Sequence, residues 1–379
     1  MAGNMRQPID EHALAEYIQA NVPVIRVPLK LKQFSHGQSN PTYEITSSTG
    51  TKYVLRKKPP GKVLSASAHQ IEREYRIIKS LENTDVPVPK TYGLCENASI
   101  IGTPFYIMEF LDGRIFEDAW LPDQSPEERR ELWKEAVRTL TKMHKVNLSA
   151  VNLADWKRAT RFYSRQVKTL SRVSFEQARV RNNATGRAVG SLPYLKELVS
   201  FFAKESTQPV ERKALVHGDF KIDNLVFHKT EPRVIGILDW EMATEGHPLS
   251  DLVNLTAPFI WSTMRVPMTI EQSLTKELKE AQEKFRQGSV PGMPSLAECY
   301  RWYGEGMGWD PESDSDWAVA FNLFRTAVIM QGITARMAQE QASGTKAARF
   351  ALQTIPYAIW SNASVEMIKN KGLGVRGKL

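Results

Sequence analysis

One short stretch of the chain carries side chains suited to moving a proton beside a metal-bound phosphate. It reads His217-Gly218-Asp219-Phe220-Lys221-Ile222-Asp223-Asn224, with Asn224 five residues after Asp219. A carboxylate at Asp219 can lie beside an attacking hydroxyl and accept its proton. An amide oxygen one loop-turn later can reach a metal ion on the phosphates. The order and spacing therefore predict phosphoryl transfer, with Asp219 as the catalytic base.

A second acidic position follows 15 residues after Asn224, where Asp239 ends the β-rich run Val234-Ile235-Gly236-Ile237-Leu238. Magnesium prefers oxygen ligands, so we expect Asn224 and Asp239 to hold this ion. Taken singly, each motif could be a polar turn at a strand end, but the ordered combination favours catalysis. Leu238-Asp239-Trp240 stands where protein kinases have Asp-Phe-Gly, and no Ala-Pro-Glu follows it. Both departures argue against a protein kinase.

The remaining contacts to a nucleotide are expected from the N-terminal part. Arg56 ends the run Tyr53-Val54-Leu55-Arg56, where a cation can reach the α- and β-phosphates. Glu74, on the helix that follows, can pair with Arg56, and Glu72 is the alternative partner. Both carboxylates could instead belong to a solvated helix face. Because the guanidinium is planar, an Arg–Glu pair here could be bidentate.

A turn between the first two predicted strands offers further phosphate contacts. It reads His36-Gly37-Gln38-Ser39-Asn40, and exposed N–H groups in such a turn can bind phosphate oxygens. Gly37, Ser39 and Asn40 are therefore candidate nucleotide-binding residues. The turn lacks a full Gly-x-Gly-x-x-Gly pattern, so a plain hairpin turn remains the alternative.

The pattern of elements predicts an α+β fold with two lobes. Short β-prone runs over residues 31–34, 42–46 and 52–56 predict three antiparallel strands, followed by a helix near 68–83 and a strand over 105–108. Residues 1–110 are thus expected to form a small sheet with one helix. Ser125-Pro126-Glu127-Glu128 is a strong helix start, and helical spacing dominates to the end. We expect a mainly helical lobe over 111–379, joined by a hinge near 108–113.

Composition limits the class of protein. The chain has 379 residues, 42% of them apolar, and a net charge of +8, which favours anionic ligands. Its basic residues are dispersed, so nucleic acid is not expected as a partner. No apolar run long enough for a membrane span and no signal peptide is recognised. The seven histidines form no His-Glu-x-x-His or His-x-His pair, which argues against a metal-dependent hydrolase.

Two features bear on localisation. Cys95 and Cys299 are far apart in the sequence and are expected to be buried thiols in a reducing compartment, which suggests the cytoplasm. The chain ends in Gly377-Lys378-Leu379, which is close to the peroxisomal address Ser-Lys-Leu. A peroxisomal location is therefore an alternative, and an ordinary basic tail is another.

Together these motifs resemble the aminoglycoside phosphotransferase/choline kinase superfamily over roughly residues 30–260. The resemblance rests on the stretches 34–43, 54–56, 72–75, 86–90, 216–220 and 237–240. It implies a protein-kinase-like fold, ATP and magnesium as cofactors, and a small-molecule alcohol as acceptor. It also implies that main-chain groups of Met108, Glu109 and Phe110 bind adenine and that Asp251 braces the catalytic loop. A helix N-terminal aspartate is the alternative for Asp251.

Within the superfamily, residues 102–109 and 223–228 look most like the phosphotransferase-like domain fused to certain large acyl-CoA dehydrogenases. This similarity implies a hydroxyacyl-CoA or hydroxy acid as acceptor. The basic residues Arg158, Arg161, Arg165, Lys168 and Arg172 could receive an anionic group of it, or form a solvated helix face. The alternative function is a catalytically inactive kinase-like binding or scaffold protein. The acceptor, the choice of ATP or GTP and the oligomeric state are not marked by any motif.

Overall fold

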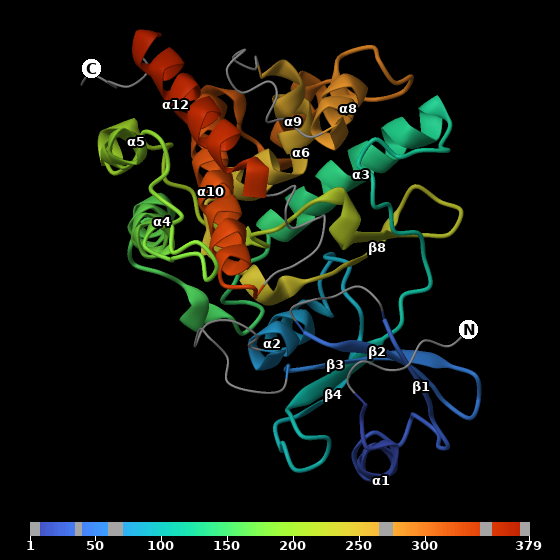
Figure 1. The fold of residues 1–379 in the computed structure, drawn as a ribbon. Coiled ribbons are helices and arrows are strands. Elements are labelled where there is room, and N and C mark those ends of the chain that lie inside the picture. The colour runs from blue at the N-terminus through green and yellow to red at the C-terminus, as the bar shows by residue number, and fades with distance from the viewer. Residues whose placement is uncertain (1–7, 35–39, 60–70, 265–275, 342–350, 372–379) are drawn as a thin grey trace.

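The computed structural model describes residues 8–34, 40–59, 71–264, 276–341 and 351–371, which form two lobes (Figure 1). The N-terminal lobe contains a five-stranded antiparallel sheet in the order β1-β2-β3-β5-β4. Its strands are β1 (Lys30–Gln33), β2 (Thr42–Thr46), β3 (Lys52–Lys57), β4 (Thr91–Cys95) and β5 (Phe105–Glu109). Gly50, at φ 81°, supplies the left-handed residue of the turn between β2 and β3. The predicted α+β architecture is confirmed.

A helix covers each face of this sheet. Side chains alternate between the two faces of a strand, and one face packs on α1 (Glu11–Asn21) through Leu14 and Ile18. The other face packs on α2 (Ile71–Leu81), whose Ile77 and Ile78 join the core shared with the second lobe. The prediction of one helix in this lobe was wrong, because α1 exposes most of its surface and shows few buried positions. Only its Asp10 N-cap and the Leu14–Ile18 spacing mark it in the sequence.

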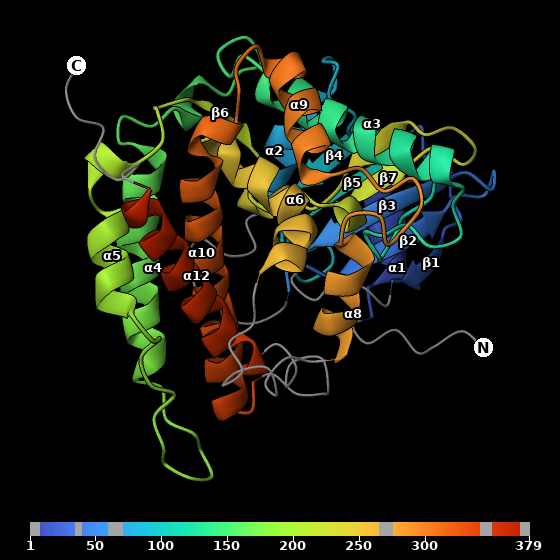
Figure 2. The same cartoon turned by 90° about the horizontal axis from the view of Figure 1, so that it is seen from above.

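The second lobe is mainly helical. It opens with α3 (Pro126–His144), where Ser125 accepts the amide of Glu128 as its N-cap and Pro126 is the first residue, as predicted. Its other helices are α4 (Phe162–Ala178), α5 (Leu195–Phe202), α6 (Leu249–Thr263), α8 (Lys276–Phe285), α9 (Leu296–Met307), α10 (Glu312–Ala338) and α12 (Thr354–Asn370). α10 and α12 lie side by side, with α4 and α5 beside them (Figure 2).

Two small antiparallel sheets hold the loops that carry the chemical motifs. β7 (Leu225–Phe227) pairs with β8 (Val234–Ile237), and β6 (Ala214–Val216) pairs with β9 (Thr244–Gly246). Asp219 therefore lies in the connection from β6 to β7, and Asp239 in the connection from β8 to β9. These strands are only three or four residues long. β9 is therefore too short to show the alternation of apolar and polar residues that would predict a strand from the sequence.

The helix α10 is long and apolar enough to meet a length-and-composition criterion for a membrane span, contrary to the sequence expectation. About 61% of its most apolar window is buried inside the fold, against α12, α4 and α6. Burial of this kind is also found in the core helix of a globular protein. Cys95 and Cys299 are buried free thiols, as expected. The lobe boundary at 110 and the C-terminal tripeptide, which lies outside the described residues, stay predictions.

Candidate active site

Arg56 connects the sheet to Asp239 of the helical lobe, the residue that the sequence predicts to bind magnesium. Its Nε lies 3.0 Å from Oε2 of Glu74 on α2, and a terminal guanidinium nitrogen lies 2.8 Å from Oδ1 of Asp239. Glu241 approaches the same nitrogen at 4.0 Å. The structure thus brings together three residues that the sequence analysis linked to nucleotide and metal binding.

Of the two carboxylates on α2 that could pair with Arg56, Glu74 is the one that does. Glu74 is 2% exposed and pairs with Arg56, whereas Glu72 is 29% exposed and pairs with Lys58 at 2.6 Å. Burial raises the pKa of Glu74 to about 7, against the opposing effect of Arg56. Burial alone would lower the pKa of Arg56, but the charges of Glu74 and Asp239 and the neighbouring Tyr106 raise it above its usual value. The guanidinium therefore stays charged in a poorly solvated place.

The catalytic loop holds Asp219 beside Asn224. The amide nitrogen of Asn224 donates to the main-chain oxygen of Asp219 at 2.8 Å and to its Oδ2 at 3.1 Å. The carboxylate of Asp219 is 34% exposed, so a second molecule can reach it. Its partly open position and its bond to an amide fit a base that must receive a proton from a bound hydroxyl.

Lys221 is a site residue that the sequence analysis did not single out. Its Nζ lies 3.5 Å from Oδ2 of Asp219 and 3.2 Å from Oδ2 of Asp223. Burial alone would lower the pKa of Lys221, but these two carboxylates raise it, so the amine is a firm cation. Its signal in the sequence is a cation two residues after Asp219 and two before Asp223.

Buried hydrogen bonds fix the shape of this loop. Asp251, in the first turn of α6, accepts the amide of His217 at 2.6 Å and that of Gly218 at 2.9 Å. Burial alone would raise the pKa of Asp251, but His144 and the bond from the His217 amide hold it below its usual value. Asp251 is thus an ionised brace of the catalytic loop.

His217 links the two motif loops. Its Nε2 lies 2.9 Å from the carbonyl oxygen of Leu238, and its Nδ1 accepts the amide of Asp219 at 3.2 Å. These partners require the proton on Nε2. The ring therefore ties the residue before Asp239 to the main chain of Asp219 and is not free to act as a base.

The main chain has positive φ angles at Gly218, next to Asp219, and at Asp239 itself. Gly218 has φ 86°, and a Cβ there would lie 2.9 Å from Cβ of Met242. Asp239 itself has the left-handed angles φ 67° and ψ 59°, a conformation that costs free energy in a residue other than glycine. Such outliers gather at functional sites, where the surrounding structure maintains them.

The residues present suit magnesium bound together with a polyphosphate. No group of three or more His, Cys, Asp or Glu that could hold a metal alone is found within the described ranges. With its amide nitrogen bonded to Asp219, Asn224 keeps its oxygen for another partner. Asp239 offers a carboxylate, of which Oδ1 faces Arg56. One or two protein oxygens, completed by phosphates and water, are the usual ligands of magnesium.

The structure describes only some of the other residues predicted to contact the nucleotide. Met108 and Glu109 end β5, and the amide of Glu109 donates to the carbonyl oxygen of Lys90 at 2.8 Å, so that donor is already used. Phe110 lies under Nζ of Lys52, which is 5.1 Å from the ring centre. Asn40 is buried before β2, and Gly37 and Ser39 lie outside the described residues. Their roles stay predictions.

Of the basic residues near α4, some fit the solvated face and others fit neither interpretation. Arg161 pairs with Glu211 at 3.0 Å, and Arg165 donates to the carbonyl oxygen of Glu245 at 3.0 Å. These two therefore fasten α4 to neighbouring segments. Lys168 and Arg172 are exposed, as on a solvated face.

A family model described as the phosphotransferase enzyme family matches residues 30–298. The chain belongs to this family. Among relatives, acyl-CoA dehydrogenase family member 10 of Mus musculus is 36% identical over 342 residues, which is 89% of this chain and 30% of that protein. The chain spans 30–40% of the length of the curated relatives that it matches first.

Solved members of the phosphotransferase family share this architecture. A crystal structure from Ralstonia eutropha, provisionally described as an aminoglycoside phosphotransferase, has a TM-score of 0.77 and 31% identity, covering 95% of this chain and 99% of that one. The ternary complex of streptomycin, ATP and APH(2″)-IIa has a TM-score of 0.52 and 16% identity, covering 86% and 90%. The second likeness supports the fold alone. Both agree with the two-lobed kinase-like fold expected from the sequence.

Proposed function

We propose that this protein is an ATP- and magnesium-dependent kinase that transfers the γ-phosphoryl group to a hydroxyl of a small molecule. The observation that carries the proposal is the meeting of Arg56, Glu74 and Asp239 beside the loop that holds Asp219 and Asn224. A phosphate-binding cation, two oxygen ligands and a base are the parts that this chemistry needs. Nucleotide-bound relatives of the same fold support ATP as the donor.

In this proposal Asp219 orients the acceptor hydroxyl and takes its proton as the bond to phosphorus forms. Asn224 keeps Asp219 in place and, with Asp239, would hold magnesium, which neutralises developing charge on the phosphates. Arg56, oriented by Glu74, binds the α- and β-phosphates. Lys221 offers a further positive charge where the phosphoryl group passes. Most of the catalytic effect would come from positioning and electrostatics.

We further propose a hydroxy acid or a hydroxyacyl-CoA as acceptor. The support is the similarity to proteins named acyl-CoA dehydrogenases, whose substrates by name are acyl-CoA compounds, together with a chain charge of +8. A cationic aminoglycoside suits such a charge less well. Choline and ethanolamine are disfavoured for the same reason.

Thermal unfolding with nucleotides tests the proposal first. ATP at about 100 times its dissociation constant should stabilise the protein by about 2.7 kcal/mol. The shift should need magnesium and should be lost in Asp239→Ala. ADP and GTP serve as comparison ligands, and a screen of hydroxy acids and hydroxyacyl-CoAs for ATP consumption follows. Binding of nucleotide without transfer to any acceptor would favour an inactive binding protein, and absence of any nucleotide effect would contradict the proposal.

A further inference from the structure

Three arginines gather along the outer edge of β9, outside the catalytic loop. Arg73 on α2 donates to the carbonyl oxygen of Ala243 at 2.8 Å, and Arg165 on α4 donates to that of Glu245 at 3.0 Å. The third is Arg158, in the loop before α4, whose amide donates to Oε2 of Glu245 at 2.5 Å. The cluster therefore combines residues of both lobes on one strand.

The spacing along β9 suits one phosphate held between two guanidinium groups. Ala243 and Glu245 are two residues apart in an extended chain, so their carbonyl groups leave the same edge about 6.6 Å from each other. One guanidinium lies on each of these oxygens. The ring of Trp156 holds Arg73 further, with its centre 3.9 Å from Cζ. A phosphate whose oxygens accept from both guanidinium groups at about 2.8 Å fits this separation.

These arginines keep donors for a ligand. Within the described ranges, the guanidinium of Arg73 donates to one carbonyl oxygen, and that of Arg165 donates to two, those of Thr160 and Glu245. A guanidinium has more N–H groups than this, so the contact that fastens Arg165 to β9 leaves others for a ligand. Arg158 is exposed, and its guanidinium forms no hydrogen bond or ion pair with the described residues. Arg73 and Arg165 are half-buried, so a molecule from solvent can reach all three.

The carboxylates near the cluster each have another cation close by. These pairs are Asp155 with Arg76 at 2.6 Å, Glu211 with Arg161 at 3.0 Å and Glu245 with Lys213 at 3.9 Å. Burial lowers the pKa of Arg73 and of Arg165, and the positive charge of Arg158 lowers both further, more strongly than any one carboxylate raises them. The three cations thus repel one another, and a bound anion would relieve this repulsion.

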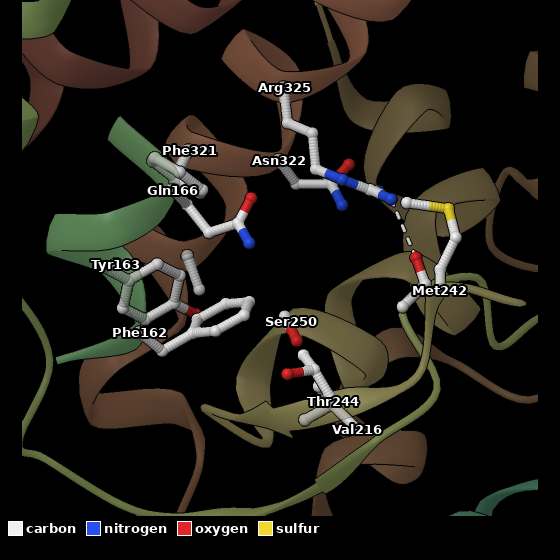
Figure 3. A pocket seen from close by; sticks show the side chains of 12 residues that line it. Phe162, Tyr163, Gln166, Val216, Met242, Thr244, Ser250, Phe321, Asn322 and Arg325 are labelled. Atoms are coloured by element: carbon white, nitrogen blue, oxygen red, sulfur yellow. Dashed lines mark hydrogen bonds between the residues drawn. The ribbon is translucent and has the colours of Figure 1, made fainter. Parts of the chain in front are cut away.

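The cluster lies within reach of the proposed base. Met242 and Thr244 line a small cavity of about 60 Å³ together with Gly218, and α4 and α10 form its other walls (Figure 3). Val216 pairs with Thr244 and precedes Asp219 by three residues, which span at most about 11 Å. The arginines on β9 therefore lie roughly 10–15 Å from the base.

We propose that Arg73, Arg158 and Arg165 bind a phosphate group that the acceptor already carries. The inference rests on the proposed function and narrows its acceptor class to hydroxyl compounds with a phosphate roughly 10–15 Å from the reacting hydroxyl. A short free hydroxy acid cannot span this distance, whereas a coenzyme A thioester can. Met242, which is 50% exposed, offers an apolar surface to the part of the acceptor between the two groups. Planar guanidinium groups suit phosphate because they donate two parallel hydrogen bonds to its oxygens.

Phosphopantetheine and pantetheine differ only in the phosphate and contain no nucleotide, so they test the site without phosphoryl transfer. Calorimetry on the full chain should show phosphopantetheine binding at least about tenfold more tightly. Arg73→Gln, Arg158→Gln and Arg165→Gln should each weaken phosphopantetheine about five- to tenfold, because each removes a charge-assisted hydrogen bond. Binding of pantetheine should not change. Coenzyme A binding more tightly than phosphopantetheine, and weakened by the same substitutions, would identify a thioester as the source of the phosphate; equal binding would identify a simpler phosphomonoester.

The matched control is Arg172→Gln, which removes an exposed cation of α4 outside the cluster. It should leave phosphopantetheine binding unchanged. Arg158 is exposed and held only through its main chain, so Arg158→Gln should keep the melting temperature of the wild-type protein. Its loss of affinity is then not a loss of folded protein. Equal binding of pantetheine and phosphopantetheine, or an equal loss in Arg172→Gln and Arg158→Gln, would overturn the proposal.

The magnesium-dependent thermal shift with ATP, measured on the same samples, separates the two proposals. An ATP shift without any preference for phosphopantetheine would refute the arginine site alone. Phosphopantetheine binding that depends on the arginines, without an ATP shift, would refute the kinase and leave the phosphate site standing.

Discussion

The role proposed for Asp219 depends on one carboxylate, which lies in a loop held by hydrogen bonds from Asn224 and to Asp251. In Asp219→Asn the side chain keeps its size but cannot take a proton. We expect kcat for phosphoryl transfer to fall about 10²- to 10⁴-fold, while the thermal shift with magnesium and ATP stays the same. Asp223→Asn, which changes a neighbouring carboxylate that also pairs with Lys221, is the matched control and should cost less than tenfold. Wild-type transfer by Asp219→Asn would refute the base.

Glu74 and Glu72 lie two residues apart, but replacing each by alanine should lower the free energy of unfolding by very different amounts. Glu74→Ala removes the fully buried partner of Arg56 and leaves it Asp239 and the more distant Glu241, so the loss should approach the roughly 3–5 kcal/mol of a broken buried pair. Glu72→Ala removes a partly exposed pair with Lys58, worth at most about 1 kcal/mol. Urea unfolding followed by circular dichroism measures both. Equal losses would mean that Arg56 does not depend on Glu74.

At the scale of elements, α6 sets the position of the catalytic loop through its first turn. Besides Asp251, this end carries His247, whose Nε2 lies 2.9 Å from the carbonyl oxygen of Val210 and whose Nδ1 accepts the amide of Leu249. Burial lowers the pKa of His247 from 6.5 to about 4. The folded protein therefore keeps this ring neutral at a pH where the unfolded chain protonates it.

This difference predicts a pH dependence of stability. The unfolded state binds more protons between pH 6.5 and about 4, so the free energy of unfolding should fall as the pH drops through that window. The contribution of His247 is about 3 kcal/mol. His247→Asn should flatten this part of the curve, whereas His12→Asn, at a side chain that is 85% exposed, should not. An unchanged slope in His247→Asn would contradict the assignment.

The elements that could be predicted from the sequence are those that local residues determine. α3 was predicted because Ser125 and Pro126 act locally, and β2 and β3 because their turns and alternation are local too. β9 pairs with β6 across about thirty residues, and three residues carry no periodicity that a sequence pattern can use. The cavity beside Gly218 could not be predicted for a similar reason. α4 and α10 line it with ordinary helix residues, such as Gln166 and Arg325, that only tertiary packing brings together.

At the scale of the whole molecule, Arg56 is one of several arginines of the N-terminal lobe that contact the helical lobe, as Arg73 and Arg76 also do. Arg56 and Asp239 are 183 residues apart, and their contact joins the sheet to the loop proposed to hold magnesium. If Asp239 holds magnesium as proposed, the metal ion and the guanidinium would compete for the same carboxylate. The nucleotide phosphates offer Arg56 another partner, so binding of ATP and metal should be coupled through this exchange of partners.

Replacing Arg56 by a neutral residue should then change the affinities for metal and for nucleotide in opposite directions. In the paired variant Arg56→Gln with Glu74→Gln, no buried charge is left alone and Asp239 loses its protein cation. We expect the nucleotide-free protein to bind manganese, a spectroscopic substitute for magnesium, about five- to tenfold more tightly, because about 1 kcal/mol of competition is removed. ATP should bind more weakly because its phosphates lose a cation. Water-proton relaxation measures the first effect and calorimetry the second, with Lys58→Gln as the control at the same end of the sheet. If manganese binding weakened together with ATP binding, Arg56 would be supporting the metal site rather than competing for it, and the proposed exchange of partners would be wrong.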